Sequence, residues 1–388
     1  MMRLDLQDRR SAMISYRFFG AFRLLLAILV LLQHFIANIG PVAWMRAAHP
    51  YAIGEVAVLA FFALSGFVIC EAIDRFYGRR PVAFLLNRLL RIVPHFVVAV
   101  LLSLVVHAVF LKFGTLLYGR DSGALPDGAF SFGNVVLNLL SFLPAVDRGM
   151  SHNFLEIAWT IRVEMMFYVL ACLAIALPSL GLSRYRLLGI RVDVAATVTV
   201  STALFVLALA GRLPAMFLFV PHFAFGVAAY LALMERAGSV LLGVAALAGI
   251  TLTAAHRAAA QASPEVAEAW MAQIILLFVL LAAMCMAATI RSRRFAALDQ
   301  MLGRLTFPLY LTHQSVQVTV LSVAGGNSVV SFAIAVALSL ATAVALSALV
   351  DPAVDRLRDT VRGRRLNNAP AESPANASVG RSAGASAA

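Results

Sequence analysis

The sequence predicts an all-α, polytopic integral membrane protein of about ten transmembrane helices, with both termini in the cytoplasm. Of the 388 residues, 62% are hydrophobic and only 13% are charged, and the mean hydropathy is +0.89. Soluble domains carry about 25% charged residues. The apolar residues also come in runs of about twenty, the length that crosses a bilayer core of about 30 Å. Basic residues gather at the ends of these runs.

The ten apolar runs are the elements that we expect to span the membrane. They cover residues 18–38, 52–72, 92–111, 157–178, 193–210, 214–234, 238–255, 270–290, 304–322 and 328–350. A further stretch, 134–146, is too short to span and is expected to be re-entrant or interfacial. We expect residues 1–17 to be a cytoplasmic N-terminus, and residues 18–350 to form the transmembrane domain, with a long outside loop at 112–156. Residues 351–388 are expected to be a cytoplasmic tail, first basic and then disordered.

The distribution of charge sets the predicted topology. With 134–146 outside the membrane, most of the 31 Lys and Arg residues fall in segments on the cytoplasmic side, as the positive-inside rule requires. This distribution accounts for the net charge of +12 without nucleic acid as a partner. The first apolar run is too long for a signal peptide and is expected to remain as a helix. Cys70, Cys172 and Cys285 lie far apart inside apolar runs, so neither a disulfide framework nor a metal site is expected.

Ionisable residues within a span are functional candidates because burying them in the bilayer is costly. Arg23 and His34 share one face of the first span and stand roughly 16 Å apart along the helix axis. Arg23 is expected near the cytoplasmic surface and His34 beyond the midplane. The structural alternatives are an arginine that reaches the interface and a histidine that makes a packing hydrogen bond.

Two further arginines, Arg88 and Arg91, lie one turn apart at the inner start of the third span. Paired guanidinium groups on one helix face are suited to binding phosphate. The alternative is ordinary anchoring at the membrane surface.

Glu164 is a carboxylate well inside the fourth span, where it shares a helix face with Thr160 and Tyr168. Its predicted depth is similar to that of His34, so the two side chains can meet if their helices are neighbours. A carboxylate that orients a histidine favours general-base chemistry towards a hydroxyl group. The alternative is a buried glutamate with a packing partner.

Five motifs, taken together and in order, resemble the membrane acyltransferase-3 family of bacterial glycan O-acyltransferases. They are the Arg-x10-His of Arg23 and His34, FFALSGFVI at 61–69, RLLRIVP at 88–94, WTIRVEMMFY at 159–168 and GRLTFPLYLTH at 303–313. The resemblance runs from about Arg17 to His313. The family's fourth-span motif more often reads WSLSVEEQFY, so Arg162 and Met165 replace a small residue and a second acid. No hydrolase-like domain fused after the last span is expected, so transfer is completed within the membrane part or by a separate periplasmic partner.

The resemblance implies transfer of an acyl group from a cytoplasmic acyl-CoA, with acetyl-CoA the first candidate, to a hydroxyl of a glycan that can be lipid-linked. It implies no tightly bound cofactor, and a place in the bacterial inner membrane. Arg88 and Arg91, with Arg23, are implied to hold the donor's phosphates, while His34, oriented by Glu164, deprotonates the acceptor or carries the acyl group. Lower-ranked candidates for substrate binding are Ser65, Trp159, Arg162, Tyr168, Tyr310 and His313. For Ser65 and its neighbour Gly66 the first interpretation is close helix packing, and substrate binding by Ser65 ranks below it.

Two other classes of function remain open from the sequence. A transporter or flippase for a lipid-linked sugar or acyl carrier also suits ten spans, although no internal repeat or matched pair of broken helices is evident. A non-catalytic scaffold for glycan assembly leaves the Arg, His and Glu residues within the spans unexplained.

Overall fold

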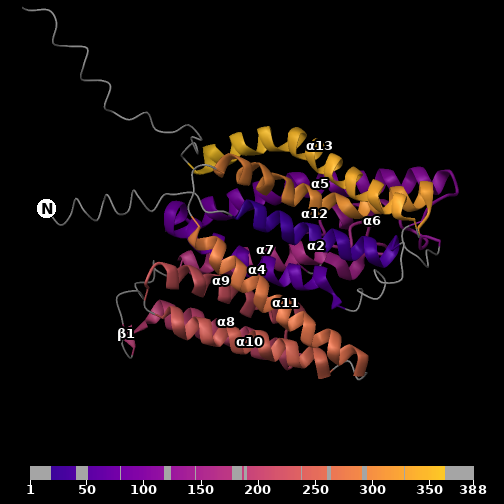
Figure 1. Ribbon diagram of the computed structural model, residues 1–388. Coiled ribbons are helices and arrows are strands. Elements are labelled where there is room, and N and C mark those ends of the chain that lie inside the picture. The colour runs from indigo at the N-terminus through magenta and orange to yellow at the C-terminus, as the bar shows by residue number, and fades with distance from the viewer. Residues whose placement is uncertain are drawn as a thin grey trace, which may run out of the picture.

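The computed structural model is a bundle of long helices (Figure 1). It describes residues 19–40, 51–78, 80–117, 124–144, 146–176, 186–187, 190–236, 238–259, 264–290, 295–326 and 328–362. The segment 1–17 and the disordered tail expected from about residue 367 lie outside these residues. The prediction of an all-α fold is confirmed, with one small exception. Strands β1 (Arg186–Leu187) and β2 (Ile190–Arg191) form a short antiparallel hairpin.

Each predicted span is mostly helical over the residues that the structure describes. The long helices are α2 (Gly20–Asn38), α4 (Ile53–Ala72), α5 (Pro81–Lys112), α7 (Ala158–Ala176), α8 (Val192–Leu209), α9 (Val220–Leu233), α10 (Ser239–Ala259), α11 (Pro264–Thr289), α12 (Ala296–Ala324) and α13 (Val329–Arg362). Short elements complete the bundle: the π-helical turn η2 (Ile73–Tyr77) after α4, helix α6 (Phe132–Leu139), and the 3-10 turns η3 (Val146–Gly149) and η6 (Ala215–Phe219). The expected tail after residue 350 begins as a continuation of α13, which is helical to Arg362.

Within the residues that the structure describes, eight helices are long and apolar enough to cross a membrane. The two predicted spans outside this group are α8, of which only Val198–Leu209 enters this comparison, and α12. Helix α12 carries polar residues that are covered by protein. Thr312, His313 and Gln317 are all buried against neighbouring helices, so these residues do not face lipid. The total of ten spans and the side on which the termini lie therefore stay predictions. The eight-residue α6, which occupies much of 134–146, rises only about 12 Å and is too short to span.

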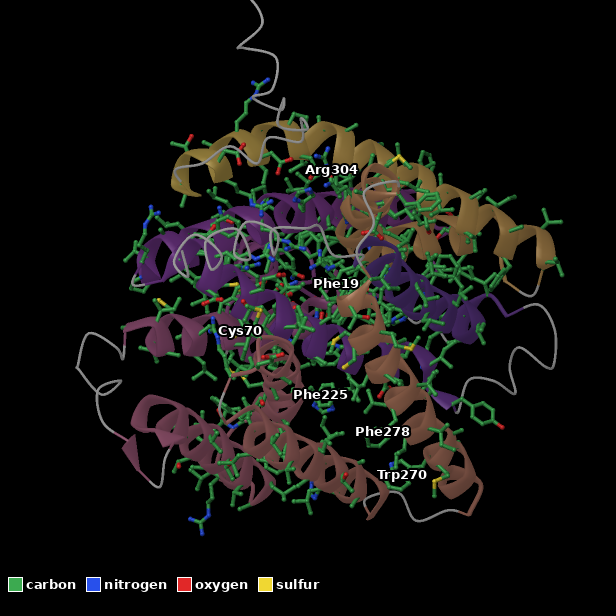
Figure 2. All side chains as sticks on the ribbon, turned by 60° about the vertical axis from the view of Figure 1, so that its left-hand side comes forward. Phe19, Cys70, Phe225, Trp270, Phe278 and Arg304 are labelled. Atoms are coloured by element: carbon green, nitrogen blue, oxygen red, sulfur yellow. The ribbon has the colours of Figure 1, made fainter. Side chains whose placement is uncertain are left out.

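The exterior of the bundle is apolar, as lipid contact requires. Leu349 on α13 and Met286 on α11 are 73% and 67% exposed, and Figure 2 shows mostly carbon side chains along the outside of the ribbons.

Small residues let two central helices approach closely. Helix α4 packs extensively on α9, and a Cβ atom on Gly66 would lie 2.1 Å from the carbonyl oxygen of Phe223. A Cβ atom on Gly226 would lie 1.7 Å from the carbonyl oxygen of Ala63. The expectation that Gly66 permits close helix contact is confirmed.

One end of the bundle collects the starts of several helices. The first residue of α2, Gly20, contacts Asp299 near the start of α12. Asn87, near the start of α5, contacts Arg358 near the end of α13. We call this end, where α2, α5 and α12 start and α13 ends, the basic end. It is the end that the sequence predicts to face the cytoplasm.

Candidate active site

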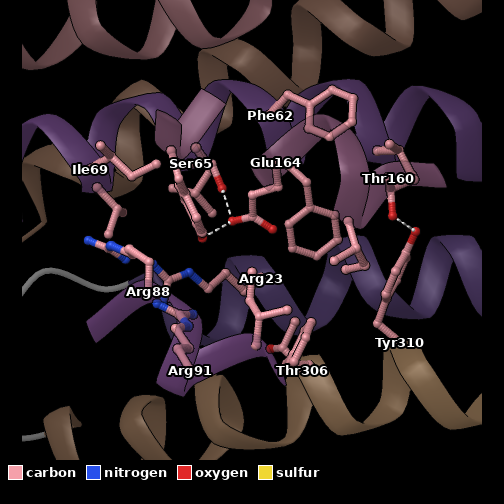
Figure 3. A pocket seen from close by; sticks show the side chains of 18 of the residues that line it. Arg23, Phe62, Ser65, Ile69, Arg88, Arg91, Thr160, Glu164, Thr306 and Tyr310 are labelled. Atoms are coloured by element: carbon pink, nitrogen blue, oxygen red, sulfur yellow. Dashed lines mark hydrogen bonds between the residues drawn. The ribbon is translucent and has the colours of Figure 1, made fainter. Parts of the chain in front are cut away.

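A pocket opens between α2, α4, α5, α7 and α12 (Figure 3). It encloses about 840 Å³ of space, including its mouth. Figure 3 shows the guanidinium groups of Arg88 and Arg91 at one end, Glu164 in the middle, and Thr160 with Tyr310 at the other end. The charged side chains that line it are Arg23, Arg88, Arg91 and Glu164. Four charged residues predicted from three separate spans therefore share one cavity with an excess of positive charge.

Arg88 is held in place by aromatic rings. Its side chain is buried, and its guanidinium lies over the rings of Phe84 and Tyr168, at 5.4 and 5.7 Å from their centroids. These are cation–π distances. The buried Nε atom of Arg88 has no hydrogen-bond partner among the described residues. A buried, incompletely satisfied guanidinium beside a cavity indicates a site for an anion.

A residue that was not predicted as part of the site, Asp299, holds the start of the helix that carries Arg23. The carboxylate of Asp299 accepts hydrogen bonds from the backbone amides of Gly20 (2.8 Å) and Ala21 (2.7 Å). These amides begin α2 and have no partners within the helix, so Asp299 caps α2 from another helix. Arg23 lies one turn further on. Asp299 thus fixes the start of the helix from which Arg23 reaches the pocket.

Glu164 is anchored by two hydroxyl groups. Its Oε1 accepts hydrogen bonds from Ser65 of α4 at 3.0 Å and from Tyr168, one turn along α7, at 2.5 Å. The second oxygen points into the pocket in Figure 3. Among the described residues Glu164 makes no hydrogen bond with His34, so the structure does not pair these two side chains. Ser65 therefore fixes the carboxylate as well as packing between helices.

His34 lies instead beside His313. Their ring centroids are 5.1 Å apart, and neither histidine lines the arginine pocket. Nδ1 of His313 is 2.7 Å from the carbonyl oxygen of Tyr310, which can only accept, so Nδ1 carries the proton. In the neutral ring Nε2 then carries the lone pair, and this buried atom has no hydrogen-bond partner among the described residues. His313 is thus arranged to accept a proton or a hydrogen bond.

Two other predicted site residues lie outside the pocket lining. Arg162 is buried and donates from Nη1 to the carbonyl oxygen of Ser141 at 3.2 Å, just beyond the end of α6. This contact places a positive charge at the negative end of a helix. Trp159 packs on Phe62 and Phe219, with centroid separations of 6.3 and 5.6 Å. Both residues contribute packing next to the site.

The apolar helices, with a charged pocket between them and a histidine pair beyond it, define a multi-pass membrane protein with a polar site inside its helix bundle. The family comparison makes this class specific. The model of the acyltransferase-3 family, described as an acyltransferase domain, matches residues 16–348. The chain therefore belongs to the acyltransferase-3 family of membrane acyltransferases.

A curated relative adds a distant likeness. The chain is 28% identical, over 135 residues, to the exopolysaccharide production protein ExoZ of Rhizobium meliloti (strain 1021). The match covers 34% of this chain and 38% of that protein, so it spans well under half of the relative. No solved structure matches the chain.

Proposed function

We propose that this protein is an O-acyltransferase of the bacterial inner membrane. It moves an acyl group from a cytoplasmic acyl-CoA, with acetyl-CoA as the first candidate, to a hydroxyl group of an exported or surface glycan. The observation that carries the proposal is the cluster of Arg23, Arg88 and Arg91 around one cavity, with Glu164 as the one acid in its lining. Membership of the family supports acyl transfer, and the name of the ExoZ relative supports a polysaccharide acceptor.

The arginines are proposed to hold the donor's phosphates. A CoA donor carries several phosphate charges at one end and its thioester at the other. Guanidinium groups bind phosphate by paired hydrogen bonds, and the cluster lies towards the basic end, which the positive-inside rule predicts to face the cytoplasm. The narrow pantetheine arm would then lie along the pocket, past Glu164, with the thioester towards Tyr310.

The histidines are proposed to handle the proton. His34 or His313 takes the proton of the acceptor hydroxyl, and the hydroxyl oxygen attacks the carbonyl carbon of the thioester. The carbon–sulfur bond breaks, an ester forms, and the proton passes to the CoA thiolate. In an alternative two-step route, His34 first takes the acyl group from sulfur and then gives it to the hydroxyl oxygen. The second route produces an acylated enzyme even when no acceptor is present, whereas the first route produces none.

The donor assignment is testable by binding. Full-length protein in lipid nanodiscs is expected to bind acetyl-CoA, and Arg88→Gln is expected to weaken it by about ten- to a hundredfold, because a hydrogen bond to a charged group contributes about 1.5–3 kcal/mol. Arg356→Gln is the matched control, since Arg356 is exposed on α13 and lies outside the pocket. Equal affinities of the two variants for acetyl-CoA would overturn the assignment.

A further inference from the structure

The pocket has a wall at the end away from Arg88 and Arg91 (Figure 3). Tyr310 of α12 and Thr160 of α7 form it, and their hydroxyl oxygens are 2.7 Å apart. Thr160 donates its own proton to the carbonyl oxygen of Ile157 at 2.8 Å. A hydroxyl group has a single proton to donate, so Tyr310 is the donor in the bond to Thr160. The ring of Tyr310 is thereby tied to α7.

Aromatic packing fixes the same wall from its sides. The ring of Phe61 meets that of Tyr310 edge to face, with centroids 6.2 Å apart. Tyr310 is only 7% exposed and Thr160 only 6% exposed. The wall therefore joins three helices, α4, α7 and α12, and it can open only if the Tyr310–Thr160 bond breaks.

The histidine pair lies beyond this wall. His313 follows Tyr310 by nearly one turn of α12, with ring centroids 6.0 Å apart, and His34 lies 5.1 Å from His313. Tyr310 lines the arginine pocket, whereas the two histidines do not. Tyr310 thus stands between the place proposed for the donor's phosphates and the groups proposed to move the proton.

We infer that Tyr310 limits the length of the acyl group that the pocket accepts. The inference rests on the proposed function, because it requires the phosphates to bind at the arginines and the acyl end to point towards Tyr310. A short acyl group fits in front of the ring. Each added methylene must displace the ring, break its bond to Thr160 or leave the pocket between helices, and a packed interior accommodates extra volume poorly.

The test is the dependence of donor affinity on chain length. Wild-type protein in nanodiscs is titrated with acetyl-, butyryl- and octanoyl-CoA, with empty nanodiscs as the background for partition of the longer chains into lipid. The dissociation constant is expected to rise by about tenfold or more from acetyl to octanoyl. Tyr310→Phe keeps the ring but loses its bond to Thr160, so its ratio is expected to lie between those of the wild type and Tyr310→Ala. In Tyr310→Ala, the dissociation constants for octanoyl-CoA and acetyl-CoA are expected to differ by no more than about threefold.

Control variants show whether a change in the ratio of dissociation constants arises at Tyr310. Tyr51→Ala removes a tyrosine that is 45% exposed and outside the pocket, so it keeps the wild-type ratio. Where Tyr310→Ala does not reach wild-type abundance in the membrane, Tyr310→Leu replaces it. A wild-type ratio in Tyr310→Ala or Tyr310→Leu, or equal wild-type affinity for all three donors, overturns the inference alone. A wild-type protein that binds none of the donors overturns the proposed function as well.

Discussion

The carboxylate of Asp299 accepts a hydrogen bond from the backbone amide of Gly20 at 2.8 Å, and so joins the start of α12 to the start of α2. The approach is close enough that a Cβ atom on Gly20 would lie 1.7 Å from the carbonyl oxygen of Asp299. Gly303, one turn along α12, lines the same pocket as Arg23. The α2–α12 crossing therefore sets where Arg23 sits relative to Arg88 and Arg91.

Asp299 is expected to act on donor binding through Arg23. Asp299→Ala removes a helix cap that contributes about 1 kcal/mol, so affinity for acetyl-CoA should fall by about fivefold, and less in Asp299→Asn, which keeps one acceptor oxygen. The diagnostic measurement is the same titration with acetyl-pantetheine, which has no phosphate. Its affinity should not change. An equal loss for both donors would mean that Asp299 supports the fold in general and does not position Arg23.

Gly20→Ala should separate the two helices and weaken acetyl-CoA binding at least as much as Asp299→Ala. The matched control is Gly243→Ala, because a Cβ atom on Gly243 would meet only Ala228, at 3.8 Å. Thermal unfolding in nanodiscs and acetyl-CoA titration report on both variants. Wild-type affinity in a stably folded Gly20→Ala protein would show that the close crossing is not needed.

Glu164 is expected to matter for turnover more than for donor affinity. Glu164→Gln keeps an oxygen for Ser65 and Tyr168 but removes the negative charge near the donor's phosphates, so acetyl-CoA should bind equally well or more tightly. Acyl transfer should fall by about tenfold or more if the charge assists proton movement. Comparing kcat with the dissociation constant distinguishes the two effects. Weaker binding with unchanged kcat would contradict this role.

His34 and His313 are expected to work as one unit. Each single change to alanine should lower the rate of transfer by about a hundredfold or more, and the double variant should lose little beyond either single variant. His256→Ala is the control, since His256 is exposed on α10. The readout is labelled acyl ester formed per unit of membrane-inserted protein. Losses that multiply in the double variant would indicate independent roles.

Arg162 is expected to contribute to stability and not to acceptor binding. Arg162→Gln weakens a buried, charge-assisted hydrogen bond to the Ser141 carbonyl, which should lower the free energy of unfolding by about 1–3 kcal/mol. Proteolysis between α6 and α7 in nanodiscs should become faster. A normal proteolysis rate combined with a raised KM for an anionic glycan acceptor would restore Arg162 as a substrate contact.

The spans and most pocket residues could be predicted because each leaves a local signal. Apolar runs reveal the helices, and an arginine or glutamate inside a run stands out because its burial needs a reason. Arg23 and Glu164 were found in this way, whereas Arg88 and Arg91 were found from their one-turn spacing just before a span, and the pocket brings all four together. The polar helix α12 was also predicted as a span, although it is not among the helices that are long and apolar enough to cross a membrane.

Pairings between helices could not be predicted, because helix periodicity fixes the face of a residue but not the neighbour of that face. The predicted Glu164–His34 contact is absent from the interactions of Glu164, which bonds to Ser65 and Tyr168. Asp299 was missed because it lies just before a predicted span, where an acid looks like an ordinary surface residue. Its function as a cap depends on the start of α2, which is 279 positions away.

The most direct test of the central claim is mass spectrometry of surface and secreted glycans. It compares a strain lacking the gene, the same strain with the intact gene, and one with His34→Ala at matched membrane abundance. Acyl transfer to glycan predicts that one ester mass disappears on deletion and returns with the intact gene but not with His34→Ala. An unchanged ester profile with a whole glycan missing on deletion would contradict the claim and indicate transport.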